Sequence, residues 1–105
     1  MAHQANYAVI FISKRTEGDH GYAEAMERIE KLGRAVPGFV ALESARAADG
    51  KGITVVFYEN AEAIEHWRQN DEHKKVKAEG RRTWYSEYQI YFTKLERGHG
   101  WTRED

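Results

Sequence analysis

Trp67 and His73 are the two residues whose types and spacing suggest chemistry on a small ligand. An imidazole has a pKa near neutrality, so His73 can accept a proton from a phenolic ligand as a general base. The indole N–H of Trp67 can donate a hydrogen bond to an oxygen of a bound aromatic compound. Each residue also has a structural interpretation. Trp67 fits a core aromatic following Ile64, and His73 fits a capping or surface residue of a helical turn.

Arginines supply a second kind of candidate. Arg81 belongs to a basic run within residues 74–82. Such a run can bind an anionic substrate, or it can stabilise the C-terminus of a helix. Arg46 lies in a half-apolar segment and needs a partner there, so we expect Glu43 or a cross-strand carboxylate to pair with it.

Metal and thiol chemistry find little support. The chain has no Cys, which excludes disulfides, thiol nucleophiles and Cys-based zinc sites. His66 and His73 are seven residues apart, so about 10 Å separates them along a regular helix. Asp19 and His20 form a loop pair with no third ligand nearby in the sequence. We therefore expect no metal site.

Length and charge narrow the remaining classes. The 105 residues predict one domain with a core at about 7–97 and a polar tail at 98–105. Lys and Arg number 16 against 17 Asp and Glu, which gives no basic field for nucleic acid. The N-terminus lacks the basic region and apolar core of a signal peptide, and no apolar run approaches the roughly 20 residues of a membrane helix. We expect a cytoplasmic protein that binds neither nucleic acid nor membranes.

The elements that position these residues follow from hydrophobic periodicity. The pattern predicts the order β-α-β-β-α-β, the ferredoxin-like arrangement of the α+β class, with two helices on one face of a four-stranded antiparallel sheet. The first helix begins at Tyr22 and stops at Gly33. The second runs from an N-cap at Asn60 to Gly80, with a break near Gln69. The expected strands are residues 7–14, 39–47, 53–58 and 84–96.

Both faces of the predicted sheet are apolar. In the first strand, Val9 and Phe11 point to one face, while Ile10 and Ile12 point to the other. One chain has helices for only one face. We therefore expect a homodimer in which the second faces of two sheets pack together.

Aromatic residues open the last strand and are candidates for lining a ligand site. Alternation places Trp84 and Tyr88 on one face of the strand and Tyr85 on the other. One set would line a pocket and the other would build the dimer interface. With the basic run, the substrate-binding candidates are Tyr85, Tyr88, Trp84 and Arg81.

A family resemblance rests on segments spread along the chain. They are Pro37-Gly38-Phe39, Glu43-Ser44-Ala45-Arg46, Gly52-Ile53-Thr54-Val55, Glu62-Ala63-Ile64-x-x-Trp67, Glu72-His73 and Gly80-Arg81-x-x-Trp84-Tyr85-x-x-Tyr88. With them, the chain from about Tyr7 to Arg97 resembles the antibiotic biosynthesis monooxygenase (ABM) family of dimeric α/β barrels. That family mixes oxygenases, heme degraders and proteins of unknown role.

The resemblance implies a pocket between the second helix and the sheet. It also implies cofactor-independent oxidation of an aromatic or polycyclic phenol or quinol by molecular oxygen. Trp67 would orient the substrate, His73 would act as base or hydrogen-bond partner, and Tyr85 or Tyr88 would line the pocket. No cofactor is expected, because Lys77 stands where heme-degrading members carry their ligating His.

One departure favours a rival interpretation. The family's oxygenases carry an Asn about one helical turn before the Trp, and here that position is Ala63. The rival is a non-catalytic, dimeric, small-molecule-binding protein associated with stress. An isomerase or lyase on the same scaffold is a third alternative, since one fold hosts many chemistries.

Overall fold

The computed structural model describes residues 5–104. The predictions made for residues 1–4 and for Asp105 fall outside that range. The elements follow the predicted order, with the second helix in two pieces and a π-helical turn before the last strand. They are β1 (Tyr7–Arg15), α1 (Tyr22–Arg34), β2 (Phe39–Arg46), β3 (Lys51–Tyr58), α2 (Ala61–Arg68), α3 (Asp71–Glu79), η1 (Gly80–Trp84) and β4 (Tyr85–Lys94).

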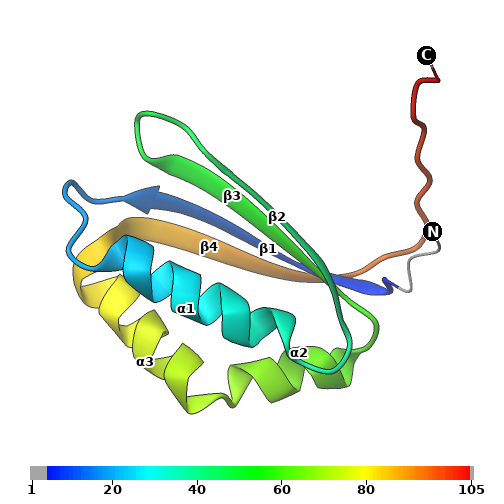
Figure 1. The fold of residues 1–105 in the computed structure, drawn as a ribbon, viewed down its shortest axis with the longest axis horizontal. Coiled ribbons are helices and arrows are strands. Elements are labelled where there is room, and N and C mark those ends of the chain that lie inside the picture. Colours follow the sequence, from blue (N-terminus) through cyan, green and yellow to red (C-terminus); the bar gives the residue numbers. More distant parts are fainter. Residues whose placement is uncertain (1–4, 105) are drawn as a thin grey trace.

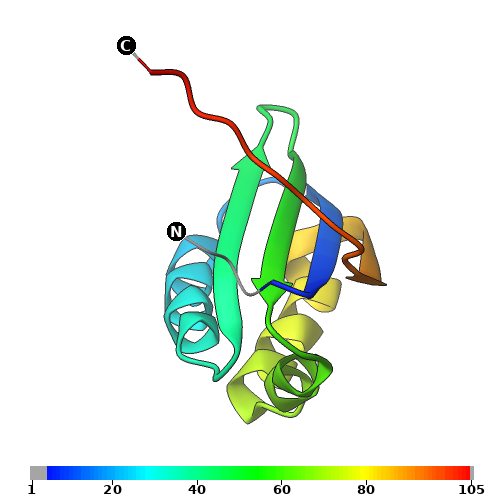
Figure 2. The same ribbon diagram turned by 90° about the vertical axis from the view of Figure 1, so that its right-hand side faces the viewer.

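The four strands form one antiparallel sheet in the order β2-β3-β1-β4. All three α-helices lie on the same side of this sheet, α1 beside α3 and α2 near the start of β2 (Figure 1). The view turned by 90° shows the same two layers from the side (Figure 2). This arrangement confirms the predicted ferredoxin-like α+β fold.

Strand register divides the apolar residues between the two faces. On the helical side, Phe11 of β1 lies between Thr54 of β3 and Ile90 of β4. On the opposite side, Ile12 pairs with Ile53, which is 48% exposed. Tyr91 on that side is 51% exposed. A single chain therefore leaves an apolar sheet face uncovered, as the alternation of residues predicts.

Two asparagines divide the second helical segment. The side chain of Asn60 accepts a hydrogen bond from the backbone N–H of Ala63 and caps α2. Asn70 does the same for His73 at 2.9 Å and caps α3. Short polar side chains suit this position because they satisfy N–H groups that have no partner within the helix. The predicted break near Gln69 is confirmed.

Several predicted boundaries differ from the observed ones by one or two residues, and two of these differences matter for the site. Gly33 does not stop the first helix but lies in its last turn, where a Cβ would stand 3.4 Å from Cζ2 of Trp67. Glycine at that position lets the indole pack closely on α1. Trp84 does not open the last strand but closes the π-helical turn. Its carbonyl accepts the backbone N–H of Thr16, so the turn is tied to the end of β1.

After β4 the chain leaves the body of the molecule. Residues 95–104 contain no helix or strand and run away from the sheet (Figure 1). Trp101 in this segment is 79% exposed. Across residues 5–104, none of the helices has the length and apolar character needed to cross a bilayer.

The cap at Asn70 gives a stability prediction. Asn70→Ala removes the oxygen that accepts the His73 N–H, and we expect the free energy of unfolding to fall by about 1 kcal/mol. Urea denaturation followed by circular dichroism measures this loss. Asn70→Asp replaces the amide oxygen with a carboxylate oxygen that can accept the same hydrogen bond, so this variant should retain most of the stability. Equal losses in both variants would contradict a capping role.

Candidate functional site: a cavity between the helices and the sheet

A cavity of about 370 Å³ lies between the helical layer and the sheet. Its volume is within the range of small-molecule sites in proteins. Helices and strands both contribute mainly apolar side chains to its wall. They include Met26, Ile29, Ile64, Trp67 and Val76 from the helices, and Val9, Phe11, Leu42, Val56, Ile90 and Phe92 from the strands.

The cavity exists because the two layers do not close on each other. Among residues 5–104 the buried apolar residues are few and mostly small: Ala8, Ala25, Val36, Tyr58, Ala63 and Trp84. The larger side chains along α1 and α2 are only half-buried, because they face the cavity instead of a filled core. Covering such apolar surface is worth roughly 25 cal/mol per Å². An apolar ligand of suitable shape would therefore gain binding energy from this wall.

Trp67 and His73 lie together at one end of the cavity. Their rings are stacked, with centroids 4.3 Å apart and planes 17° from parallel. In an unbroken helix, six residues turn a side chain by about 240°, so the two rings would face different ways. The break after α2 changes the helix direction and folds His73 back over the indole. Both predicted catalytic candidates therefore line the same cavity.

The surroundings of His73 favour its neutral form. Burial lowers the pKa of the imidazole, and Lys77 lowers it further, while the bond to the Trp67 carbonyl acts in the opposite direction. The balance of these effects lowers the pKa of His73 from its ordinary value of 6.5. Nδ1 lies 3.2 Å from the carbonyl oxygen of Trp67, which can only accept. In the neutral ring Nδ1 therefore carries the proton, and Nε2 is free to accept one.

Hydroxyl groups and arginines surround the other end of the cavity. The phenol oxygens of Tyr22 and Tyr85 are 3.4 Å apart. Arg46 donates to the Tyr22 oxygen at 3.3 Å and to Oγ of Ser13 at 3.0 Å. Arg15 stacks on the Tyr22 ring, 3.7 Å from its centroid. Burial and the neighbouring Tyr22 raise the pKa of Tyr85, so its hydroxyl stays protonated and able to donate.

The predicted partner of Arg46 is wrong. Across residues 5–104 no carboxylate lies within ion-pair distance of its guanidinium, and Glu43 is not a partner. Its third hydrogen bond goes to the Gly50 carbonyl at 2.6 Å. A Cβ at Gly52 would lie 2.6 Å from the guanidinium carbon, so the side chain rests directly on the β3 backbone. Neutral oxygens of the hairpin and of the cavity wall, not an acid, hold this arginine.

The predicted faces of the last strand also need correction. Tyr85 and Tyr88 both line the cavity, with ring centroids 6.1 Å apart. An irregularity in the β1–β4 register after Lys14 pairs Arg15 with Tyr85, so strict alternation fails at this end of β4.

The two remaining substrate-binding candidates lie outside the cavity wall. Trp84 is buried, and its Nε1–H donates to the His20 carbonyl at 2.8 Å. Arg81 is exposed and donates to the Tyr88 hydroxyl at 3.1 Å, so it reaches the site only through that residue.

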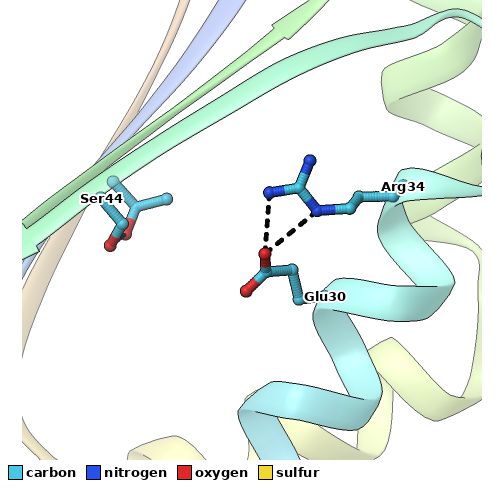
Figure 3. Close-up of polar contacts among 4 residues, drawn as sticks. Glu30, Arg34 and Ser44 are labelled. Carbon is cyan, nitrogen blue, oxygen red and sulfur yellow. Dashed lines mark hydrogen bonds and ion pairs between the residues drawn. The ribbon is translucent and has the colours of Figure 1, made fainter.

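The cavity wall reaches solvent at several points, two of them on α1 and β2. Glu30 on α1 and Ser44 on β2 both line it, and both are exposed. Figure 3 shows Glu30 bound by Arg34 on the same helix, with Ser44 on the neighbouring strand of the sheet. The Ser44 hydroxyl is bonded to that of Thr54 at 2.8 Å. The exposed part of the wall is thus polar at Glu30 and Ser44, but it also includes the apolar Phe92, which is 57% exposed.

Comparison with known proteins agrees with this geometry. Residues 7–79 match the sequence model of the family described as antibiotic biosynthesis monooxygenase. The chain belongs to the antibiotic biosynthesis monooxygenase family. The chain is also similar in sequence to the uncharacterized protein YqjZ of Bacillus subtilis (strain 168). It is 46% identical over 91 residues, which are 87% of this chain and 80% of that protein.

Solved structures share the ABM fold at low identity. SnoaB, a cofactor-independent oxygenase from Streptomyces nogalater, matches with a TM-score of 0.75 at 9% identity, covering 90% of this chain and 96% of SnoaB. Rv0793 from Mycobacterium tuberculosis matches with a TM-score of 0.76 at 12% identity, covering 91% of this chain and 100% of the other. At such identities the likeness concerns the fold alone.

Some residues of the site were not identified from the sequence. Tyr22 looked like the first apolar position of a helix, and Ser13 looked like an ordinary strand residue. Their role at the cavity end depends on long-range pairing between β1, α1 and β4. The one usable signal was Arg46, an arginine in a half-apolar strand that needed a partner.

The lowered pKa of His73 predicts how stability depends on pH. Between its unfolded and folded pKa values the unfolded chain binds more protons, so the free energy of unfolding should fall as pH drops below about 6.5. Urea denaturation at pH 7.5 and pH 5.5 measures this change. His73→Gln should lose less stability than the natural sequence over that interval. His66→Gln, an exposed histidine on α2, is the control. An undiminished loss in His73→Gln would refute the assignment.

Proposed function

We propose that this chain is a cofactor-independent monooxygenase that oxidises an aromatic or polycyclic phenol or quinol in the cavity. The observation that carries the proposal is the stacked pair of Trp67 and His73 on the wall of an apolar cavity. A neutral imidazole beside an aromatic-sized space suits removal of a phenolic proton. Membership of the ABM family supports the same chemistry, and so does the fold shared with the oxygenase SnoaB.

The proposed reaction divides the work between protein and substrate. Nε2 of His73 accepts the phenolic proton, and the Trp67 indole holds the substrate ring. The electron-rich anion then reduces molecular oxygen directly. One oxygen atom enters the substrate as a carbonyl and the other leaves as water, so a phenol and O₂ give a quinone and H₂O. The apolar wall keeps bulk water away from the reactive anion.

Oxygen uptake tests the proposal. Metal-stripped protein is mixed with a panel of anthrones, naphthols and quinols, and consumption is followed with an oxygen electrode. General-base catalysis contributes about 10²-fold or more, so His73→Ala should lower the rate by about that factor. Trp67→Phe should lower it less, by about tenfold, because it removes one hydrogen bond.

His66→Ala provides the matched control for that experiment. It changes a different histidine, on α2, that does not line this cavity, and its rate should equal that of the natural sequence. Uptake no faster than the uncatalysed reaction, or equal uptake by His73→Ala, would count against the proposal.

One observation favours the non-catalytic binding protein. Ala63 is 2% exposed, and its Cβ lies only 2.8 Å from where a Cβ on Gly38 would stand. The Pro37–Phe39 connection thus packs against this position, and no amide is available one turn before Trp67. A compound that raises the melting temperature without consuming oxygen would support this second function.

We also propose that the protein is a homodimer joined through the sheet face opposite the cavity. Exposed apolar groups on that face, such as Ile53 and Tyr91, would be covered by the same face of a second copy. Light scattering should give twice the mass of one chain. Ile53→Lys should shift the mass toward that of a monomer, whereas Glu27→Lys changes an exposed polar position of α1, on the other side of the sheet, and serves as control. A monomeric natural sequence would refute this proposal.

A further inference from the structure

The cavity has two chemically different ends. Trp67 packs against the same buried cluster as Val9, whereas Arg46 bonds to Ser13, four residues further along β1. Four strand residues span about 13 Å. Helix α1 runs between the same two ends of the cavity. Gly33 near its C-terminus lies beside Trp67, and Tyr22 at its N-terminus contacts Arg46 and Tyr85. The two ends are therefore separated by more than the length of a single aromatic ring.

Arg46, Tyr22 and Tyr85 line one end of the cavity, where the exposed guanidinium of Arg46 forms no ion pair with a carboxylate of residues 5–104. Within residues 5–104, every arginine that forms an ion pair lies in a helical segment and pairs with a glutamate, as Arg34 does with Glu30. Arg46 has no such partner, and neither does Arg15, whose guanidinium lies against the Tyr22 ring. The groups around them are hydroxyls and backbone carbonyls.

We infer that this end of the cavity binds a carboxylate carried by the aromatic ligand. A guanidinium offers several N–H donors in one plane and matches the two oxygens of a carboxylate. The Tyr22 oxygen accepts from both Arg46 and Tyr85, so its own hydroxyl proton can be donated to a ligand beside the guanidinium. This inference rests on the proposed use of the cavity by an aromatic substrate, and it narrows that substrate to a hydroxy-aromatic acid of two or three fused rings. Its carboxylate lies at Arg46, and its phenol lies toward His73.

Two matched compounds test the inference without requiring turnover. In 6-hydroxy-2-naphthoate the phenol and the carboxylate are at opposite ends of the ring system, and 6-hydroxy-2-naphthamide has the same shape without the charge. Isothermal titration calorimetry under nitrogen gives the affinity of each. The natural sequence should bind the carboxylate about tenfold or more tightly than the amide, as expected for a charge-assisted hydrogen bond.

Variants then assign that preference to Arg46. In Arg46→Met the two compounds should bind equally, mainly through a loss of affinity for the carboxylate. Arg46→Lys keeps the charge but loses the paired N–H donors of the guanidinium, and should retain part of the preference for the carboxylate. Tyr22→Phe removes one hydroxyl near the guanidinium and should reduce the preference by a few-fold while leaving the Arg46 side chain intact. Arg82→Met, an exposed arginine outside the cavity, is the matched control.

The outcomes separate this inference from the proposed function. Equal binding of the two compounds by the natural sequence would overturn the inference, as would failure of both to bind, or a preference that survives in Arg46→Met. Oxygen uptake with uncharged quinols does not depend on Arg46, so uptake without a carboxylate preference would support the oxygenase alone. A carboxylate preference without any oxygen uptake would support the inference and count against turnover.

Discussion

The hydrogen bond between Asn70 and the backbone of His73 divides the helical layer, and the rest of the site is arranged around that division. Because α3 starts in a new direction, it can lie beside α1, where Arg28 and Glu72 join the two helices. The same direction leads the chain through η1 into β4, the edge strand that brings Tyr85 and Tyr88 to the cavity. An unbroken helix would have carried His73 away from Trp67.

The helices also do not fill the space above the sheet, so a cavity remains between the two layers. Small residues such as Ala25 and Ala63 form the buried contacts, while Trp67 rests on Gly33 at one end of the cavity. A closed core would be more stable, since interiors are normally packed to the density of organic crystals. A ligand that binds only the folded chain would return part of that stability by mass action. The hollow and the uncovered second face of the sheet show how little of the fold's apolar surface one chain buries by itself.

Local patterns predicted most of the fold. Strand alternation, the caps at Asn60 and Asn70, and the turn between β2 and β3 are all encoded within a few residues of where they act. The family resemblance, together with the spacing of Trp67 and His73, directed attention to the end of the cavity where these residues lie.

What the sequence could not provide depends on register. The irregularity after Lys14 turns Tyr85 to the same side as Tyr88, and no alternation rule contains it. The π-helical turn withdraws Trp84 from the strand and buries it. The partners of Arg46 come from β1, α1 and the β2–β3 turn, segments that only the folded chain brings together.

The exposure of the cavity wall at Glu30 and Ser44 bears on how fast a ligand exchanges. Both residues are exposed while they line the cavity, so a ligand can enter without the two layers separating. Many enzymes limit their turnover by the opening of a lid, on a scale of microseconds to milliseconds. An exposed cavity edge predicts an on-rate set by diffusion and by orientation at that edge instead of by a lid. Residence time would then depend on contacts inside the cavity, and the product, once it loses those contacts, could leave by the same route.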